Sequence, residues 1–564
     1  MIERQQTTWM NGGLALVLLA LLGALVVAPL GISFDRALPA DSAALESLRA
    51  LLLDASLRQA ILRTLAVALL ACAVASAIAI PAAFLAVRSG PYLRLTIQIF
   101  GFLPLTMPPY ISAAVVRHCA TIVNHSDAAP ALGELSVQGN AMVLVAVFAL
   151  HYLPFILFSQ IAGLQGIDRS LQESARNLGA NRLHVWWRIT LPLATPAYVA
   201  GASLVVLKIL EDVGTPLMLG VEGMLAPQIL LRLGAGGFSD PLLNVSALVL
   251  FVLSVLLVAI AWSALLPARE PAMPTRCSKP LHWRSGRATR AMLAALAMVL
   301  GMLALAPHLW LLLMSLGDTW SGGLLPETYS LVHFRQLLGT ELPQLATTLL
   351  YVAAAGGLTL MIGSLSAPPT RATGAVSRVV RFAATALFAI PGVVLALAYA
   401  RSQDLFEAQL AGWSGLGWLA LVCVVALKQL PFAQRLLAAQ LRTLHQGRLA
   451  SAHNLGAAPF AAYLRLGLPA LGPVLGAIFL LGVVAAAMEL SAALLLIKEP
   501  QAPLALSLFQ ALQAPATAGA GAAQAVLLVA VVATGLLLVH ALLRRRCHAL
   551  PKAPAHPTRA RKDP

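Results

Sequence analysis

The chain has 564 residues, of which 59% are hydrophobic and only 11% are charged, and its formal net charge is +16. So little polar surface cannot solvate a globular protein of this length, which excludes a soluble fold. The apolar runs are about 20 residues long, the length that an α-helix needs to cross a bilayer, and lack the alternation of a β-barrel. The sequence therefore predicts an all-α integral membrane protein.

The apolar runs predict about twelve membrane-spanning helices in two sets of six. The first run is longer than the apolar core of a typical signal peptide, so we interpret it as an uncleaved span. The first set comprises residues 11–34, 62–87, 97–116, 141–161, 193–210 and 245–266. The second set comprises residues 292–316, 345–365, 382–400, 416–437, 471–496 and 523–543.

The distribution of charge between the loops predicts the orientation. With the amino terminus in the cytoplasm, basic residues gather in the internal loops and most acidic residues in the external ones, as the positive-inside rule requires. The basic loops lie within 88–94, 169–188, 276–290, 371–381, 442–465 and the tail. Both termini are expected in the cytoplasm. The net charge then reflects contact with a lipid bilayer, and no nucleic-acid partner is expected.

The chain divides into two similar halves. Residues 268–290 are rich in proline and basic residues, as an exposed cytoplasmic linker should be. They separate a first half, 1–267, from a second half, 291–543, and a basic tail follows at 544–564. Six spans in each half give both halves the same orientation, which predicts two parallel six-helix repeats.

One polar segment, LQESARNLGANRLHVWWRITLP at 171–192, interrupts the apolar runs and recurs as LASAHNLGAAPFAAYLRLGLP at 449–469. Asn177 and Asn454 lie 454 minus 177, or 277, positions apart. Asp168 can cap a short helix that ends at Gly179, a residue that tolerates a positive φ. A helix lying on the lipid headgroups is the alternative interpretation. Because the spacing recurs, we favour docking to another protein.

This segment resembles the cytoplasmic signature of the permeases of binding-protein-dependent ABC importers. The first copy meets every spacing of the signature with Glu173, Ser174, Ala175, Gly179, Ile189, Leu191 and Pro192. The second copy has Ala450 in place of the acidic residue, followed by Ser451, Ala452, Gly456, Leu466, Leu468 and Pro469. The missing acid puts equal coupling of the two halves in doubt.

The resemblance implies a type I ABC importer permease in a bacterial inner membrane. Its coupling loops, 163–192 and 441–469, are expected to seat on two cytoplasmic ATPase subunits, which bind the ATP and Mg²⁺. An extracytoplasmic binding protein is expected to deliver the solute. The fused halves look most like the ferric-iron and thiamine branch, and 211–220 and 488–497 favour ferric iron. Thiamine and 2-aminoethylphosphonate are the alternative substrates.

Four ionisable residues within or near the spans are candidates for a pathway or gate, because charge inside a membrane is costly. His151 and Lys428 are 277 positions apart (428 minus 151), and so are Asp212 and Glu489 (489 minus 212). We expect them to line the passage or to close its outer end by ion pairing. In the alternative, structural interpretation, Lys208 pairs with Asp212 on one helix and Lys428 pairs with a neighbouring carbonyl.

The remaining motifs exclude other classes of function. None of the six lysines follows a glycine, so the chain lacks a phosphate-binding loop and is not expected to hydrolyse ATP. We find no catalytic cluster of nucleophile or carboxylates, and the five single cysteines indicate neither disulfides nor a metal site. No cofactor is expected on this chain. A secondary transporter driven by an ion gradient is the alternative, but it leaves the repeated segment unexplained.

Overall fold

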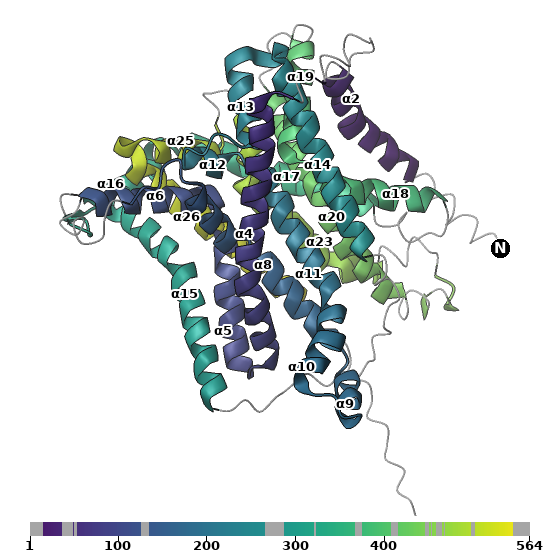
Figure 1. Ribbon diagram of the computed structural model, residues 1–564. Helices are drawn as coiled ribbons and strands as arrows, with labels where there is room; N and C mark the ends of the chain where they lie inside the picture. Colours follow the sequence, from purple (N-terminus) through teal and green to yellow (C-terminus); the bar gives the residue numbers. More distant parts are fainter. Residues whose placement is uncertain are drawn as a thin grey trace, which may run out of the picture.

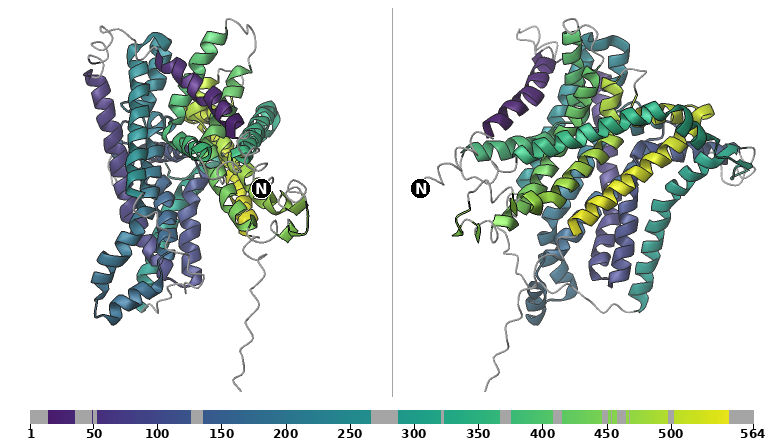
Figure 2. Two further views of the ribbon diagram at one scale, coloured as in Figure 1. Left: turned by 90° about the vertical axis from the view of Figure 1, so that its right-hand side faces the viewer. Right: turned by 180° about the vertical axis from the view of Figure 1, so that it is seen from behind.

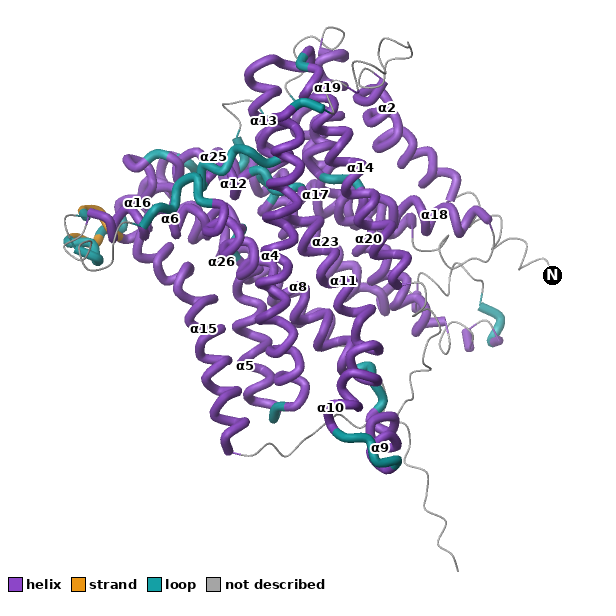
Figure 3. The backbone as a smooth tube through the Cα atoms, viewed as in Figure 1, coloured by secondary structure: helices purple, strands orange, loops and turns teal. Residues whose placement is uncertain are grey.

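The computed structural model describes residues 15–35, 49, 53–125, 135–265, 287–320, 323–366, 375–407, 415–445, 451–452, 454–457, 465–466, 468–497 and 502–544. Most of the predicted linker, the basic tail beyond residue 544 and Ala450 lie outside these residues. Helices account for nearly all of the described chain (Figure 3).

In the described part, ten helices are long and apolar enough to cross a membrane, or up to twelve if each of two bent helix pairs is one span. The predicted all-α membrane fold is therefore confirmed. The described strands are β1 (Gly317–Thr319) and β2 (Thr328–Tyr329), which pair antiparallel between two helices of the second half.

The elements of the first half are η1 (Gly23–Val27), α2 (Ala28–Asp35), α4 (Ala55–Arg88), α5 (Pro91–Phe102), η2 (Leu103–Thr106), α6 (Pro109–His125), α8 (Ala141–Gln165), α9 (Arg169–Asn177), α10 (Arg182–Val185), η3 (Trp186–Thr190), α11 (Leu191–Leu210), α12 (Gly214–Met218), α13 (Leu225–Gly236), η4 (Gly237–Ser239) and α14 (Pro241–Leu265). Those of the second half are α15 (Arg287–Leu316), α16 (Val332–Thr340), α17 (Leu342–Ser366), α18 (Ala375–Ala386), η7 (Leu387–Ala389), α19 (Gly392–Glu407), α20 (Leu416–His445), α23 (Leu468–Met488), α24 (Ser491–Leu496), α25 (Leu504–Gln513), η9 (Pro515–Thr517) and α26 (Ala518–Arg544).

The third span of each half is bent, whereas the sequence predicted uninterrupted runs at 97–116 and 382–400. The two limbs meet at 88° in the first half and at 96° in the second. The bend follows from proline, which disfavours helical backbone in the residue before it. Met107, before Pro108, has φ −120° and ψ 120°, and Ile390, before Pro391, has φ −95° and ψ 111°. Each bend starts a new helix, α6 or α19, inside the protein.

The first helix of each half packs on the other half. Helix α2 lies against α19, and the Tyr399 hydroxyl of α19 donates a hydrogen bond to the carbonyl of Leu25 at 2.7 Å. Helix α15 lies against α5 of the first half, where Gly301 lets the ring of Phe100 approach (Figure 1). In the view from behind in Figure 2, α15 again lies beside α5, and α2 lies at the opposite side of the molecule. The two halves therefore form one interlocked body and not two adjacent bundles.

Two buried threonines cap short helices from a distance. Thr64 on α4 accepts a hydrogen bond from the amide of Leu225, the first residue of α13, at 2.9 Å. Thr348 on α17 accepts from the amide of Leu504, the first residue of α25, at 3.0 Å. The first amides of a helix have no partner within it, and the residues before these two helices supply no side-chain cap. The two threonines lie 284 positions apart (348 minus 64), and they fill the same structural role in the two halves.

We predict that Thr64→Val and Thr348→Val each lower the free energy of unfolding by about 1–3 kcal/mol, because each leaves a buried amide without its acceptor. Thr359→Val is the matched control, since buried Thr359 donates to the carbonyl of Ala355 within its own helix. Thermal unfolding of the detergent-purified chain measures the effect. If all three variants unfold at the same temperature, the capping role is wrong.

Candidate functional site

The first copy of the repeated segment forms a short helix that ends in a sharp turn. The carboxylate of Asp168 accepts a hydrogen bond from the amide of Ser170 at 2.9 Å and caps the start of α9. At the other end the amide of Gly179 donates to the carbonyl of Arg176, and that of Ala180 donates to the carbonyl of Ala175. This pair of bonds is a Schellman motif, which requires a positive φ at its glycine. The φ of Gly179 is 89°.

The second copy ends in the same way. The amide of Ala457 donates to the carbonyl of Ala452 at 3.0 Å, and the φ of Gly456 is 82°. A Cβ at Gly179 or Gly456 would meet no atom within 4 Å, so these glycines are needed for backbone conformation and not for space. The alanine and the glycine of the signature are thus the two ends of one turn, and the turn is present in both halves.

Each turn presents an apolar side chain to the outside. Leu178 is 88% exposed and Leu455, its repeat mate, is 87% exposed. A single exposed leucine is ordinary, but here the same position at the tip of the turn is open in both copies. The sequence prediction did not single out either leucine, although 455 minus 178 is again 277.

The first copy is braced against the membrane helices. Gln172 donates to the hydroxyl of Thr190 at 3.2 Å within a buried contact, which ties α9 to the segment that leads into α11. The ring of Trp186 packs edge-on against Phe84 at the end of α4, with centroids 4.5 Å apart. The guanidinium of Arg88 lies 3.6 Å from the centroid of the same Phe84 ring. A displacement of α9 would therefore be transmitted to α4 and α11.

The other signature residues lie on the short coupling helix and at the start of the span that follows it. Ile189 and Leu191 are half-buried and Pro192 is exposed. Glu173 and Ser174 are exposed on α9, and Ala175 is half-buried. In the second copy Ser451, Leu466 and Pro469 are exposed and Ala452 is buried, while the side chain of Leu468 lies outside the described residues.

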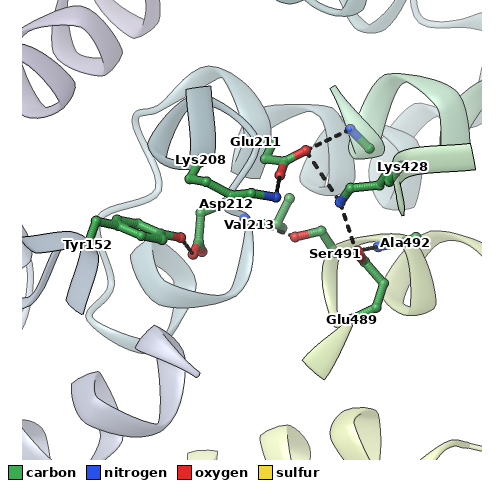
Figure 4. Close-up of polar contacts among 10 residues, drawn as sticks. Tyr152, Lys208, Glu211, Asp212, Val213, Lys428, Glu489, Ser491 and Ala492 are labelled. Atoms are coloured by element: carbon green, nitrogen blue, oxygen red, sulfur yellow. Dashed lines mark hydrogen bonds and ion pairs between the residues drawn. The ribbon is translucent and has the colours of Figure 1, made fainter. Parts of the chain in front are cut away.

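A second site lies where the two halves meet, at the ends of α11 and α23 (Figure 4). The ammonium of Lys428 on α20 lies 2.9 Å from a carboxylate oxygen of Glu489 and 3.3 Å from one of Glu211. Glu211 comes from the first half, and it also pairs with Lys208 one turn earlier on α11 at 2.5 Å. The cluster is therefore an ion-pair network that joins both halves.

Glu211 makes a further contact across the halves. The carboxylate oxygen that faces Lys428 also accepts a hydrogen bond from the amide of Gly392 at 3.0 Å. Gly392 is the first residue of α19, so the carboxylate lies at the positive end of that helix. A Cβ on Gly392 would lie 2.5 Å from the ammonium nitrogen of Lys428, so a larger residue would displace the lysine side chain from this position.

The repeat-related place in the first half is built differently. Met488 stands 277 positions after Glu211 (488 minus 211), and α6 begins with Pro109 where α19 begins with Gly392. Proline has no amide hydrogen, so a carboxylate at Met488 would have no donor to accept from. The network is asymmetric because one helix start needs an acceptor and the other does not.

The acids predicted from the repeat share one role. Asp212 accepts from the amide of Thr215 at 2.8 Å, and Glu489 accepts from the amide of Ala492 at 3.1 Å. Each caps the short helix that follows it, α12 or α24. The predicted basic pair is not equivalent, because Lys428 joins the network whereas His151 stacks edge-on against Tyr152 at 4.7 Å. Tyr152 is the residue that reaches Asp212, at 3.4 Å.

The structure thus brings together Asp212, Lys428 and Glu489 and leaves His151 apart. The structural alternative, Lys208 with Asp212, is also wrong in its partner, since Lys208 pairs with Glu211. Sequence reasoning missed Glu211 because Met488 takes its place in the repeat. The dipeptide of adjacent acids at 211–212, directly after an apolar run, was the available signal.

The two capping segments also touch each other. The hydroxyl of Ser491 accepts a hydrogen bond from the amide of Val213 at 3.3 Å. A Cβ on Gly214 would lie 2.4 Å from a methyl group of Leu490, so the chains of the two halves approach closely here. The stretches 211–220 and 488–497, which favoured ferric iron in the sequence, therefore touch each other across the two halves.

A comparison with known protein families shows the same division of the chain into two halves. The chain matches the family described as "Binding-protein-dependent transport system inner membrane component" twice, over residues 75–270 and 359–548. It is 32% identical over 150 residues to a probable molybdenum ABC transporter permease protein of Haloferax volcanii, which covers 26% of this chain and 53% of that protein. The matched part thus spans about half of that relative.

Two further relatives match over shorter segments. A putative 2-aminoethylphosphonate transport system permease protein of Salmonella typhimurium is 35% identical over 89 residues, or 16% of this chain and 30% of that protein. A spermidine/putrescine transport system permease protein of Escherichia coli is 37% identical over 68 residues, or 12% of this chain and 24% of that protein. With two matched copies that together cover more than half of its length, the chain belongs to the family of inner-membrane components of binding-protein-dependent transport systems.

Proposed function

We propose that the chain is the complete pair of permease halves of an ATP-driven importer in a bacterial inner membrane. The observation that carries the proposal is the recurrence of a Schellman-ended helix with an exposed leucine at its tip, Leu178 in one half and Leu455 in the other. Membership of the binding-protein-dependent family supports it. Two ATPase subunits would receive the two turns, and they would bind the ATP and Mg²⁺.

The geometry indicates how movement would pass from an ATPase to the spans. A displaced α9 pulls on Thr190 through Gln172, and Thr190 lies directly before α11. Helix α11 ends at Glu211, which is bound to Lys428 and to the start of α19 in the other half. The coupling turn and the interface between the halves are thus the two ends of one helix. An extracytoplasmic binding protein would supply the solute at the opposite face.

Ferric iron is the substrate that the sequence stretches favour, with thiamine as its alternative. The relatives are named as permeases for molybdenum, 2-aminoethylphosphonate and spermidine or putrescine, so the family accepts solutes of different charge and size. The Salmonella relative favours 2-aminoethylphosphonate as the second candidate. We assign most of the choice among solutes to the binding protein.

We expect Gly179→Ala and Gly456→Ala to weaken ATPase binding, because alanine in a left-handed conformation costs about 1–2 kcal/mol. Leu178→Asp and Leu455→Asp should do so without altering the turn. Co-purification of the ATPase in mild detergent measures the loss. Gly357→Ala is the control, because Gly357 also has open space around it but lies inside a helix. Equal ATPase recovery from all variants would contradict docking at these turns.

Substitutions of the acids at the interface between the halves test whether these residues act in transport. Asp212→Asn and Glu489→Gln are expected to lower the rate of uptake. Each weakens the cap of a short helix, α12 or α24, that lies at the contact between the halves. Lys428→Met should be more severe, since it leaves the carboxylates of Glu211 and Glu489 without their shared cation. Uptake is measured per amount of folded protein. Unchanged uptake in the two acid variants would remove them from the mechanism.

The substrate is tested by uptake into vesicles that contain the chain, its ATPase subunits and the binding protein. Labelled ferric iron, thiamine, 2-aminoethylphosphonate, molybdate and putrescine are supplied in turn. We expect one of them to accumulate only when ATP is present inside, and ferric iron is the first to be tried. Accumulation that follows an ion gradient without ATP would instead support a secondary transporter.

A further inference from the structure

Two arginines join the halves at the end of the molecule opposite the coupling turns. Arg117 lies on α6 of the first half and Arg401 on α19 of the second, so each is on the helix that follows the bend of a bent span. They are 401 minus 117, or 284, positions apart. Thr64 and Thr348 have the same separation, 348 minus 64. Arg117 is the ninth residue of α6 and Arg401 the tenth of α19, so the two lie within one position of each other in the two repeats.

Arg401 reaches from the second half into the first. Its guanidinium donates to the side-chain oxygen of Asn244 at 2.8 Å, to the carbonyl of Phe238 at 2.8 Å and to the carbonyl of Ser33 at 3.1 Å. Phe238 follows α13, Ser33 is near the end of α2, and Asn244 is on α14. Arg401 is only 3% exposed, so these three contacts replace its water.

Arg117 makes the reciprocal contact. Its guanidinium donates to the carbonyls of Leu512 and Gln513, the last two residues of α25 in the second half. It also donates to the carbonyl of Met218, the last residue of α12 in its own half, at 3.2 Å. The final carbonyls of a helix have no partner within it and carry partial negative charge, so a cation is well placed there.

The two contacts therefore form a matched pair. Helices α13 and α25 are the pair whose first amides are capped by Thr64 and Thr348. Each is then held at or just after its last residue by an arginine of the opposite half. A guanidinium suits this task because its donors form a rigid fork, which a lysine ammonium cannot reproduce.

We propose that Arg117 and Arg401 are positioning residues that hold the external ends of the two halves together and that release when the pathway opens outward. The proposal rests on the function proposed above, which places these ends outside the cell. Opening at this face requires α25 to leave α6 and α13 to leave α19. Breaking the contacts costs both guanidiniums their hydrogen bonds to the opposite half, which adds an energetic barrier to opening in the absence of the binding protein.

Distances between spin labels test the proposal directly. One label pair spans the Arg401 contact, at the exposed residues Ala235 and Asp404, and the other spans the Arg117 contact, at Thr121 and Ala514. The full complex is studied in nanodiscs without nucleotide. We expect Arg117→Met with Arg401→Met to add a population with longer distances at both pairs. Distributions identical to those of the unchanged chain would overturn the proposal.

We call the two arginine contacts between the halves the clamp. A control and a conservative variant separate the loss of this clamp from a general loss of stability. Arg232→Met is the control, because Arg232 on α13 bonds to Asp240 and to Ser56, both within the first half. It should leave the distances unchanged. Arg401→Lys should give an intermediate distribution, since lysine keeps the charge but not the fork. Longer distances in Arg232→Met as well would assign the effect to loosened folding and overturn the clamp.

ATPase activity provides a second measurement. The double methionine variant should raise the activity measured without binding protein by about five-fold, and each single variant by less. If the unchanged complex hydrolyses no ATP in response to its binding protein, the proposed function fails. The label distances still decide on the clamp in that case, so the two failures are distinguishable.

Discussion

The ion pairs of Lys428 hold the centre of this protein together. A lone ammonium inside a membrane protein is costly, and it is tolerated here because Glu489 of its own half and Glu211 of the other lie beside it. This geometry depends on broken helices. Glu211 is free to reach Lys428 because α11 has ended, and it meets the amide of Gly392 because α19 begins there. Without the break, the amide of Gly392 would be bonded within a continuous helix and could not donate to Glu211.

The two halves agree most closely in their backbone and differ in the side chains that exploit it. Both bend before a proline, both start a short helix under a distant threonine, and both end the coupling helix with a glycine of positive φ. Only one half supplies a glutamate to the opposite helix start. The two halves thus share one backbone arrangement, whereas the charged side chains that join them differ between the halves.

The sequence predicted what depends on composition and short-range spacing. The span count and the coupling turn follow from apolar length or from residues within a few positions of one another, and the acids at 212 and 489 follow from the repeat of 277 positions. It did not predict the bends, because membrane helices tolerate proline and the apolar runs continue across Pro108 and Pro391. It missed Glu211 because the residue at the matching position of the other half is Met488, which carries no charge. It missed Arg117 and Arg401 because all but one of their acceptors are backbone carbonyls, which no side-chain pattern reveals.

The asymmetry at Glu211 has a consequence for assembly. In a symmetric homodimer every contact occurs twice, since each surface patch meets its own copy. Two copies of the first half would place Glu211 against a helix that starts with Pro109, and would supply His151 where the network needs Lys428. Two copies of the second half would have lysines but no such glutamate. The interface is therefore specific for unlike partners, and joining them in one polypeptide guarantees that they meet in equal numbers.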